Sequence, residues 1–162
     1  MFDDALLEQA ERLLESCRRA GLRLATAESC TGGLIAGCLT AIAGSSDVVE
    51  RGFVTYANEA KMELLGVPGE LIAAHGAVSA PVARAMAEGA VARSRAALGV
   101  SVTGVAGPGG GSAEKPLGLV HIAAARRTHP TLDERHVFPG DRAAIRLAAV
   151  AAALDLLERR IA

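Results

Sequence analysis

The segment TAESCTGG, Thr26 to Gly33, places a serine and a cysteine between an acidic residue and two glycines. It follows an alternating apolar run, so Ser29 is expected where a strand passes into a helix. The first N–H groups of a helix have no partner within it, and together with the helix dipole they can stabilise a developing oxyanion. Ser29 is therefore a candidate nucleophile beside an anion hole around Thr31–Gly33. The alternative is that Ser29 or Thr31 only caps the helix.

A serine nucleophile needs a base, and none of the four histidines is clearly placed for that role. A Ser-x-x-Lys pattern is absent, because Gly32 is the third residue after Ser29. Lys61, in the segment YANEAK, falls in the first turn of an expected short helix, where a cation is disfavoured. Such a lysine, when partly buried, has a lowered pKa and can act as a neutral base. Tyr56, the only tyrosine, ends the preceding strand and could relay or donate a proton. An exposed helical lysine is the alternative.

The segment TGVAGPGGG, Thr103 to Gly111, comes directly after an expected buried strand. A loop of this composition exposes backbone N–H groups that can cradle a phosphate or a carboxylate. It lacks the Gly-x-Gly-x-x-Gly pattern of dinucleotide sites, and no Gly-Lys-Ser/Thr follows, as nucleotide-triphosphate sites require. We expect a ligand-binding loop, with an ordinary flexible turn as the alternative.

Further candidate groups lie at the start of the last helix and beside Ser29. Arg142 and Arg146 in GDRAAIR share one helix face and could clamp a phosphate, or could instead be solvated or pair with acids such as Asp141. Cys30 is a second possible nucleophile, but no histidine is evidently available to activate it, which favours a packed thiol. No metal site and no cofactor are predicted, because the histidines and acids lack metal-ligand spacing and the cysteines are scattered.

These groups must be positioned by strands that alternate with helices, which predicts an α/β fold. We expect a three-layer α/β/α sandwich, a single domain with a central mixed sheet. Asn58 is expected to cap the short helix that ends at Leu65, and Asp141 to cap the last helix. The expected helices are 3–20, 34–43, 58–65, a helix that starts at Ser79 and Pro81, and 142–160. The expected strands are 22–28, 52–56, 100–103, 117–125 and 134–138.

Composition excludes several classes of function. The 162 residues are 51% hydrophobic but only 2% aromatic, so the core must be aliphatic. A net charge of −1 provides no field for nucleic acid or an anionic membrane, and no apolar run is long enough to span a bilayer. The acidic start does not resemble a signal peptide, and three cysteines without C-x-x-C spacing fit reduced thiols in the cytoplasm. The last helix is apolar nearly all round, which favours a homo-oligomer.

Six segments together resemble the CinA C-terminal domain family, the stand-alone nicotinamide-nucleotide amidases, in both order and spacing. They are TAESCTGG, GFVTYANEAKMELLGV, HGAVSAPVARAMAEGA, VTGVAGPGGG, KPLGLVHIA and GDRAAIR. The resemblance covers nearly the whole chain, and it implies one amidase domain over residues 1–162. It also implies hydrolysis of the carboxamide of nicotinamide mononucleotide to nicotinic acid mononucleotide and ammonia.

The resemblance further assigns roles to individual residues. Ser29 would be the nucleophile, Lys61 the general base and Tyr56 an assisting hydroxyl. The residues that would bind the nucleotide substrate are Glu28, Cys30, Thr31, Gly32, Gly33, Asn58, Thr103, Gly104, Ala106, Gly107, Pro108, Gly109, Gly110 and Arg142. Two other functions stay open: a non-catalytic nucleotide- or partner-binding module of the same fold, and an amidase for another carboxamide.

Overall fold

The computed structural model describes residues 1–162 and contains one five-stranded sheet in the order β2-β1-β3-β4-β5. β1 (Leu24–Glu28) lies parallel to β2 (Val49–Val54) and to β3 (Leu98–Gly104). β4 (Leu119–Arg126) and β5 (Leu132–Val137) extend the sheet with antiparallel pairing. The expected mixed sheet is thus confirmed, and the carboxyl ends of β1 and β3, where Ser29 and the glycine-rich loop follow, lie side by side.

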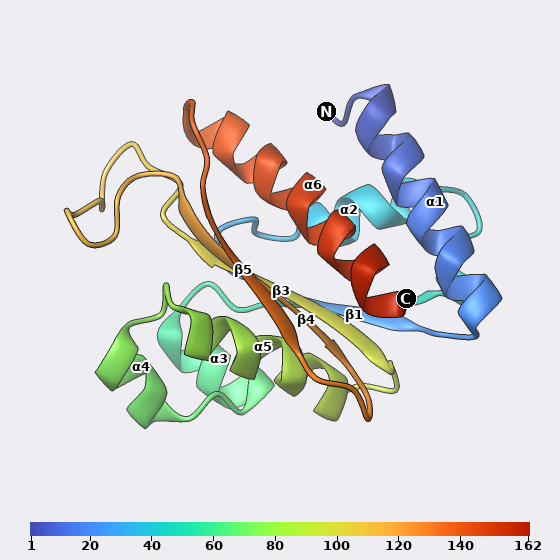
Figure 1. Cartoon of the computed structure of the whole chain (residues 1–162), viewed down its shortest axis with the longest axis horizontal. Helices are drawn as coiled ribbons and strands as arrows, with labels where there is room; N and C mark the ends of the chain where they lie inside the picture. Colours follow the sequence, from blue (N-terminus) through green and yellow to red (C-terminus); the bar gives the residue numbers. More distant parts are fainter.

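Helices cover both faces of the sheet (Figure 1). α1 (Asp4–Ala20), α2 (Leu34–Thr40) and α6 (Arg142–Ile161) pack on one face. α3 (Asn58–Leu65), α4 (Gly69–His75) and α5 (Ala80–Ala92) lie on the other, and a short 3₁₀ turn, η1 (Ser45–Asp47), leads into β2. This confirms the predicted three-layer α/β/α arrangement.

The core is aliphatic on both faces of the sheet. Along β3, Val100 and Val102 join the large cluster beneath α1, α2 and α6, whereas Ser101 donates a hydrogen bond to the Ala83 carbonyl on the α5 side. Helix α5 comes very close to its neighbours. A Cβ atom at Gly89 would lie 2.1 Å from the Leu65 carbonyl oxygen, so only glycine fits there. The end of α3 is thereby fixed against α5.

Side chains cap three helices: the expected Asp141 cap is present, Ser79 starts α5 as expected, and Asp3, expected within α1, is instead its N-cap. Asp3, Ser79 and Asp141 accept hydrogen bonds from the first turns of α1, α5 and α6. Helix α6 buries one side against the sheet and α1, which explains most of its apolar surface. The homo-oligomer expected from this helix stays a prediction. No helix is long and apolar enough to cross a membrane.

Several element boundaries differ from those expected. Helix α2 begins at Leu34 and ends at Thr40, and α4 was not expected at all. Asn58 is the first residue of α3, and the N-cap position belongs to Ala57, so the expected Asn58 cap is wrong. Strand β2 starts earlier and ends at Val54, so Tyr56 lies beyond the strand. The remaining strands differ from expectation by one or two residues at their ends.

Candidate active site

Ser29 and Lys61 lie in contact although 32 positions separate them in the chain. Ser29 directly follows β1, and its N–H donates to the Val102 carbonyl of β3 at 3.0 Å. Lys61 projects from α3, and its Nζ atom lies 3.0 Å from Ser29 Oγ. Ser29 is 9% exposed and Lys61 only 1% exposed, so their contact is shielded from bulk water.

The amine of Lys61 has three oxygen neighbours. Besides Ser29 Oγ, its Nζ lies 2.8 Å from the Thr55 carbonyl and 3.3 Å from the Tyr56 carbonyl. Burial lowers the pKa of Lys61, because desolvation disfavours the ammonium form. A neutral amine has two N–H donors and one lone pair. The two carbonyls can accept both donors, which leaves the lone pair for the Ser29 hydroxyl proton.

The loop from Ser29 to Gly33 is longer than a simple strand-to-helix junction. Gly33 occupies the N-cap position of α2 and offers no side chain, so capping by Ser29 or Thr31 is wrong. Glu28 caps the helix instead: its carboxylate accepts from the N–H groups of Ile35 at 2.8 Å and Ala36 at 3.1 Å. Glu28 is fully buried, so it holds α2 and does not face a substrate in this structure.

The same loop carries backbone donors without partners. The N–H groups of Cys30, Thr31 and Gly33 donate to no other residue of the protein. Thr31 is fully buried and Cys30 nearly so, whereas Gly33 is partly exposed. The structure therefore offers unpaired donors beside Ser29, which an anion hole requires.

Two arginines of α6 connect the loops around Ser29. Arg146 donates from Nε to the Cys30 carbonyl at 3.0 Å and from Nη2 to the Thr31 carbonyl at 3.1 Å. Arg142 donates to the Gly107 carbonyl at 2.8 Å and to the Tyr56 hydroxyl at 3.0 Å. Both arginines are hydrogen-bonded, although Arg142 is exposed, and the phosphate clamp expected of them stays a prediction.

Tyr56 stands at the edge of this arrangement. Its side chain is 62% exposed, and its hydroxyl is bonded to Arg142 and not to Ser29 or Lys61. Its main chain does reach the site, through the carbonyl that contacts Lys61. Asn58 is exposed at the start of α3 and makes no hydrogen bond with these residues.

The glycine-rich loop lines a cavity of about 520 Å³ that opens between it and the start of α6. Its walls include Ala106, Gly107, Pro108, Arg142 and Arg146. A cavity of this size suits a small molecule. Thr103, Gly104, Gly109 and Gly110 belong to the same segment but not to the walls, and the Thr103 hydroxyl donates to the Ala77 carbonyl at 2.9 Å. Arg146 joins this cavity to the Ser29 loop.

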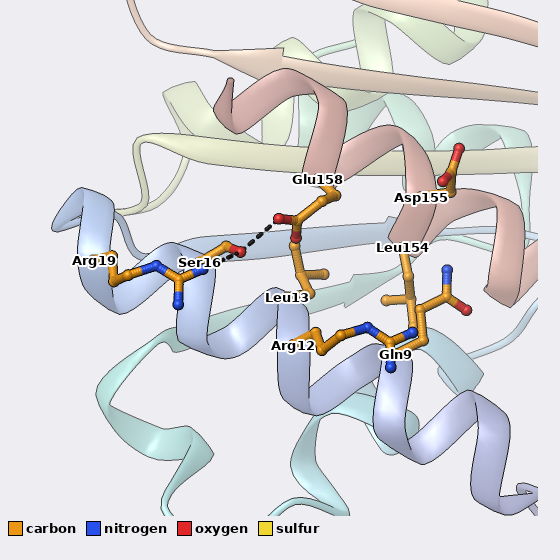
Figure 2. A pocket seen from close by; sticks show the side chains of 8 residues that line it. All are labelled: Gln9, Arg12, Leu13, Ser16, Arg19, Leu154, Asp155 and Glu158. Carbon is orange, nitrogen blue, oxygen red and sulfur yellow. Dashed lines mark hydrogen bonds between the residues drawn. The ribbon is translucent and has the colours of Figure 1, made fainter.

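A second cavity, of about 430 Å³, lies between α1 and α6 (Figure 2). Three of its polar side chains bond one another: the Ser16 hydroxyl donates to Glu158 at 2.5 Å and accepts from Arg19 at 3.1 Å. It contains none of the candidate site residues. The cavity beside the glycine-rich loop is therefore the better candidate for a substrate site.

The thiol and metal alternatives find little support in the geometry. Burial raises the pKa of the Cys30 thiol to about 11, which keeps it protonated near neutral pH. Nowhere do three or more His, Cys, Asp or Glu side chains gather as metal ligands would.

Residues 7–161 match the CinA C-terminal domain. The chain belongs to this family. Nicotinamide-nucleotide amidohydrolase PncC of Escherichia coli (strain K12) is 48% identical over 157 residues, which are 97% of this chain and 95% of PncC. A CinA-like protein of Syntrophobacter fumaroxidans is 53% identical over 145 residues, 90% of this chain but only 34% of that longer protein.

A solved structure of the CinA family supports the fold. The competence/damage inducible protein CihA from Agrobacterium tumefaciens superposes with a TM-score of 0.94 at 53% identity, covering 97% of this chain and 96% of that one. The sequence singled out Ser29 and Lys61 as candidates but did not predict that Glu28 holds the start of α2 or that Arg146 holds the loop after Ser29. No local pattern signals either contact, because each joins separate elements.

Proposed function

We propose that this chain is a nicotinamide-nucleotide amidase that converts nicotinamide mononucleotide to nicotinic acid mononucleotide and ammonia. The observation that carries the proposal is the 3.0 Å contact between Lys61 Nζ and Ser29 Oγ in a site shielded from water. The similarity to PncC over nearly the whole length of both chains supports the substrate class. The proposal covers this chain only, and not the longer CinA-like proteins.

The chemistry follows from the contact. Neutral Lys61 takes the Ser29 proton while Oγ attacks the carboxamide carbon, and the unpaired loop donors stabilise the oxyanion. The lysine then gives that proton to the amide nitrogen as the carbon–nitrogen bond breaks, and ammonia leaves. Water next attacks the acyl-enzyme, Lys61 accepts its proton, and the acid is released as Ser29 is reprotonated. No step requires a metal or cofactor.

The nucleotide part would occupy the cavity beside the glycine-rich loop. The Gly107 N–H, in the cavity wall, and the N–H groups of Gly109 and Gly110, further along the same loop, donate to no group of the protein. These N–H groups could donate to a phosphate. Arg142 adds a cation on the same side of the cavity. Tyr56, whose hydroxyl is bonded to Arg142, would assist from beside the cavity. Glu28 would act through α2 and not by direct contact with the substrate.

Ammonia release from nicotinamide mononucleotide by wild type and by Ser29→Ala tests this proposal. Loss of the nucleophile should lower the rate by at least about 1000-fold. Ser16→Ala is a matched control, since Ser16 is 7% exposed and lies in α1, outside the candidate site. Ammonia release that survives in Ser29→Ala would refute the role of Ser29 as nucleophile. Bound nucleotide without any release by wild type would favour the binding-module alternative.

A further inference from the structure

The loop that carries Ser29 has few restraints of its own. Gly32 and Gly33 both adopt positive φ angles, of 55° and 103°. Neither residue has a side chain that could pack against a neighbour. Within the loop, the Gly32 N–H donates to the Ser29 carbonyl, and the Leu34 N–H donates to the Thr31 carbonyl. A loop of this kind keeps one conformation only if neighbouring elements hold it.

Arg146 supplies such a restraint from the second turn of α6. Its Nε and Nη2 atoms donate to the carbonyls of Cys30 and Thr31, at 3.0 and 3.1 Å. The carbonyl and the N–H of a trans peptide point in opposite directions. Holding the Cys30 carbonyl therefore also fixes the direction of the Thr31 N–H.

The restraint extends one peptide further towards the nucleophile. Holding the Thr31 carbonyl fixes the Gly32 N–H, and this N–H donates to the Ser29 carbonyl. The Ser29 carbonyl shares its peptide with the Cys30 N–H, which has no acceptor in the protein. One guanidinium thus determines the orientation of three consecutive peptide groups directly after Ser29.

Arg146 also brings a positive charge to the loop. It takes part in no salt bridge, whereas Arg159 at the other end of α6 is paired with Glu134 and Asp155. The positive charge lies against the carbonyls of the two peptides whose N–H groups belong to Thr31 and Gly32. It polarises these peptides and favours negative charge that develops beside them.

We infer that Arg146 is a positioning residue, which keeps the Ser29 hydroxyl within reach of Lys61 and aims the free loop donors at the reacting carboxamide oxygen. This inference rests on the proposed amidase function. Arg146 does not touch the reacting atoms, and although it lines the cavity, its Nε and Nη2 atoms are bonded to the Cys30 and Thr31 carbonyls. Its removal should therefore slow the chemical step much more than it changes substrate affinity.

The test compares Arg146→Ala, Arg146→Lys and the control Arg159→Ala, which removes an arginine from the last turn of the same helix. Two rates are measured: ammonia release from nicotinamide mononucleotide, and labelling of Ser29 by a fluorophosphonate, in which the serine oxygen displaces fluoride from phosphorus. Arg146→Ala should lower kcat and the labelling rate about 100-fold, with KM changed less than about threefold. The kcat and labelling rate of Arg146→Lys should lie between those of wild type and of Arg146→Ala. Both rates of Arg159→Ala should match those of wild type.

Recovery of kcat on addition of guanidinium ions distinguishes a positioning role of Arg146 from a purely structural one. Millimolar guanidinium should restore part of the kcat lost in Arg146→Ala, because it can occupy the vacated place. A kcat within about threefold of wild type, or a loss found only in KM, would overturn the inference. If Arg146→Ala does not fold, Arg146→Lys decides, and an unchanged kcat in that variant overturns it equally.

The two proposals fail in different ways. Wild type that neither releases ammonia nor reacts with the fluorophosphonate at Ser29 would refute the amidase and the inference together. Wild type that does both, beside an Arg146→Ala variant that does both equally fast, would refute only the role of Arg146.

Discussion

Replacing Lys61 with methionine would measure the protonation of the buried amine without any substrate. Methionine has a chain of similar length and no ionisable group, so the variant keeps the 1%-exposed position filled. Burial lowers the pKa of Lys61, so the folded protein loses this proton at a lower pH than the unfolded chain does. Between the folded pKa and the unfolded value of about 10.4, the unfolded state holds one proton more, and wild-type stability rises with pH.

The size of the effect follows from one proton. In that window, the free energy of unfolding of wild type should gain up to about 1.4 kcal/mol per pH unit relative to Lys61→Met. Below the folded pKa both states hold the proton, so the difference between the two proteins should be flat. Above about pH 10.4 it should level off again. All other titrating groups occur in both proteins and largely cancel.

Urea denaturation followed by circular dichroism, repeated from about pH 6 to about pH 10, would provide the comparison. Lys115→Met is the control for loss of a lysine as such, since Lys115 is the only other lysine in the chain. The pH at which the stability difference begins to rise should equal the pKa seen in the pH dependence of ammonia release. A difference that stays constant over the whole range would refute a neutral Lys61.

Other predictions concern packing, capping and thiol reactivity. Gly89→Ala should destabilise by about 1–3 kcal/mol in denaturant unfolding, because its Cβ would lie 2.1 Å from the Leu65 carbonyl oxygen. Gly37→Ala, in α2, meets only a side-chain atom at 3.8 Å and should instead stabilise by about 0.5–1 kcal/mol. Ser79→Ala should lower the free energy of unfolding by about 1 kcal/mol, since its hydroxyl caps α5, and an unchanged melting temperature would argue against that cap. Burial raises the pKa of the Cys30 thiol to about 11, so a disulfide reagent near pH 8 should label this cysteine slowly until the protein unfolds.

The features that could be predicted from the sequence depend on residues that lie close together in the chain. Ser79 and Asp141, both expected at helix starts, cap helices through bonds that span three residues, and such contacts are visible in a short stretch of sequence. The alternation of strands and helices likewise predicted the three-layer fold. Helix α4 escaped prediction because its N-cap position is held by Pro68, which offers no capping side chain, and none of its residues is buried.

The contact between Ser29 and Lys61 is a different kind of feature. Their residue types suggested a nucleophile and a base, but the 3.0 Å distance depends on the end of β1 meeting α3. The sequence placed Lys61 in the first turn of a helix, where the dipole would disfavour a cation. In the structure it is the fourth residue of α3, and burial is the main cause of its lowered pKa.

The conformation of the loop after Ser29 depends on contacts with residues outside the loop. Its glycines allow the conformation but cannot select it, since a glycine accepts both signs of φ. Selection comes from Glu28, which binds the start of α2 from the preceding strand, and from Arg146, more than a hundred residues later. Under the proposed mechanism, the motif supplies the reacting hydroxyl and the donors, while Arg146 of α6 holds the carbonyls of Cys30 and Thr31. A mutation in α6 can consequently alter chemistry at Ser29 without touching the motif at all.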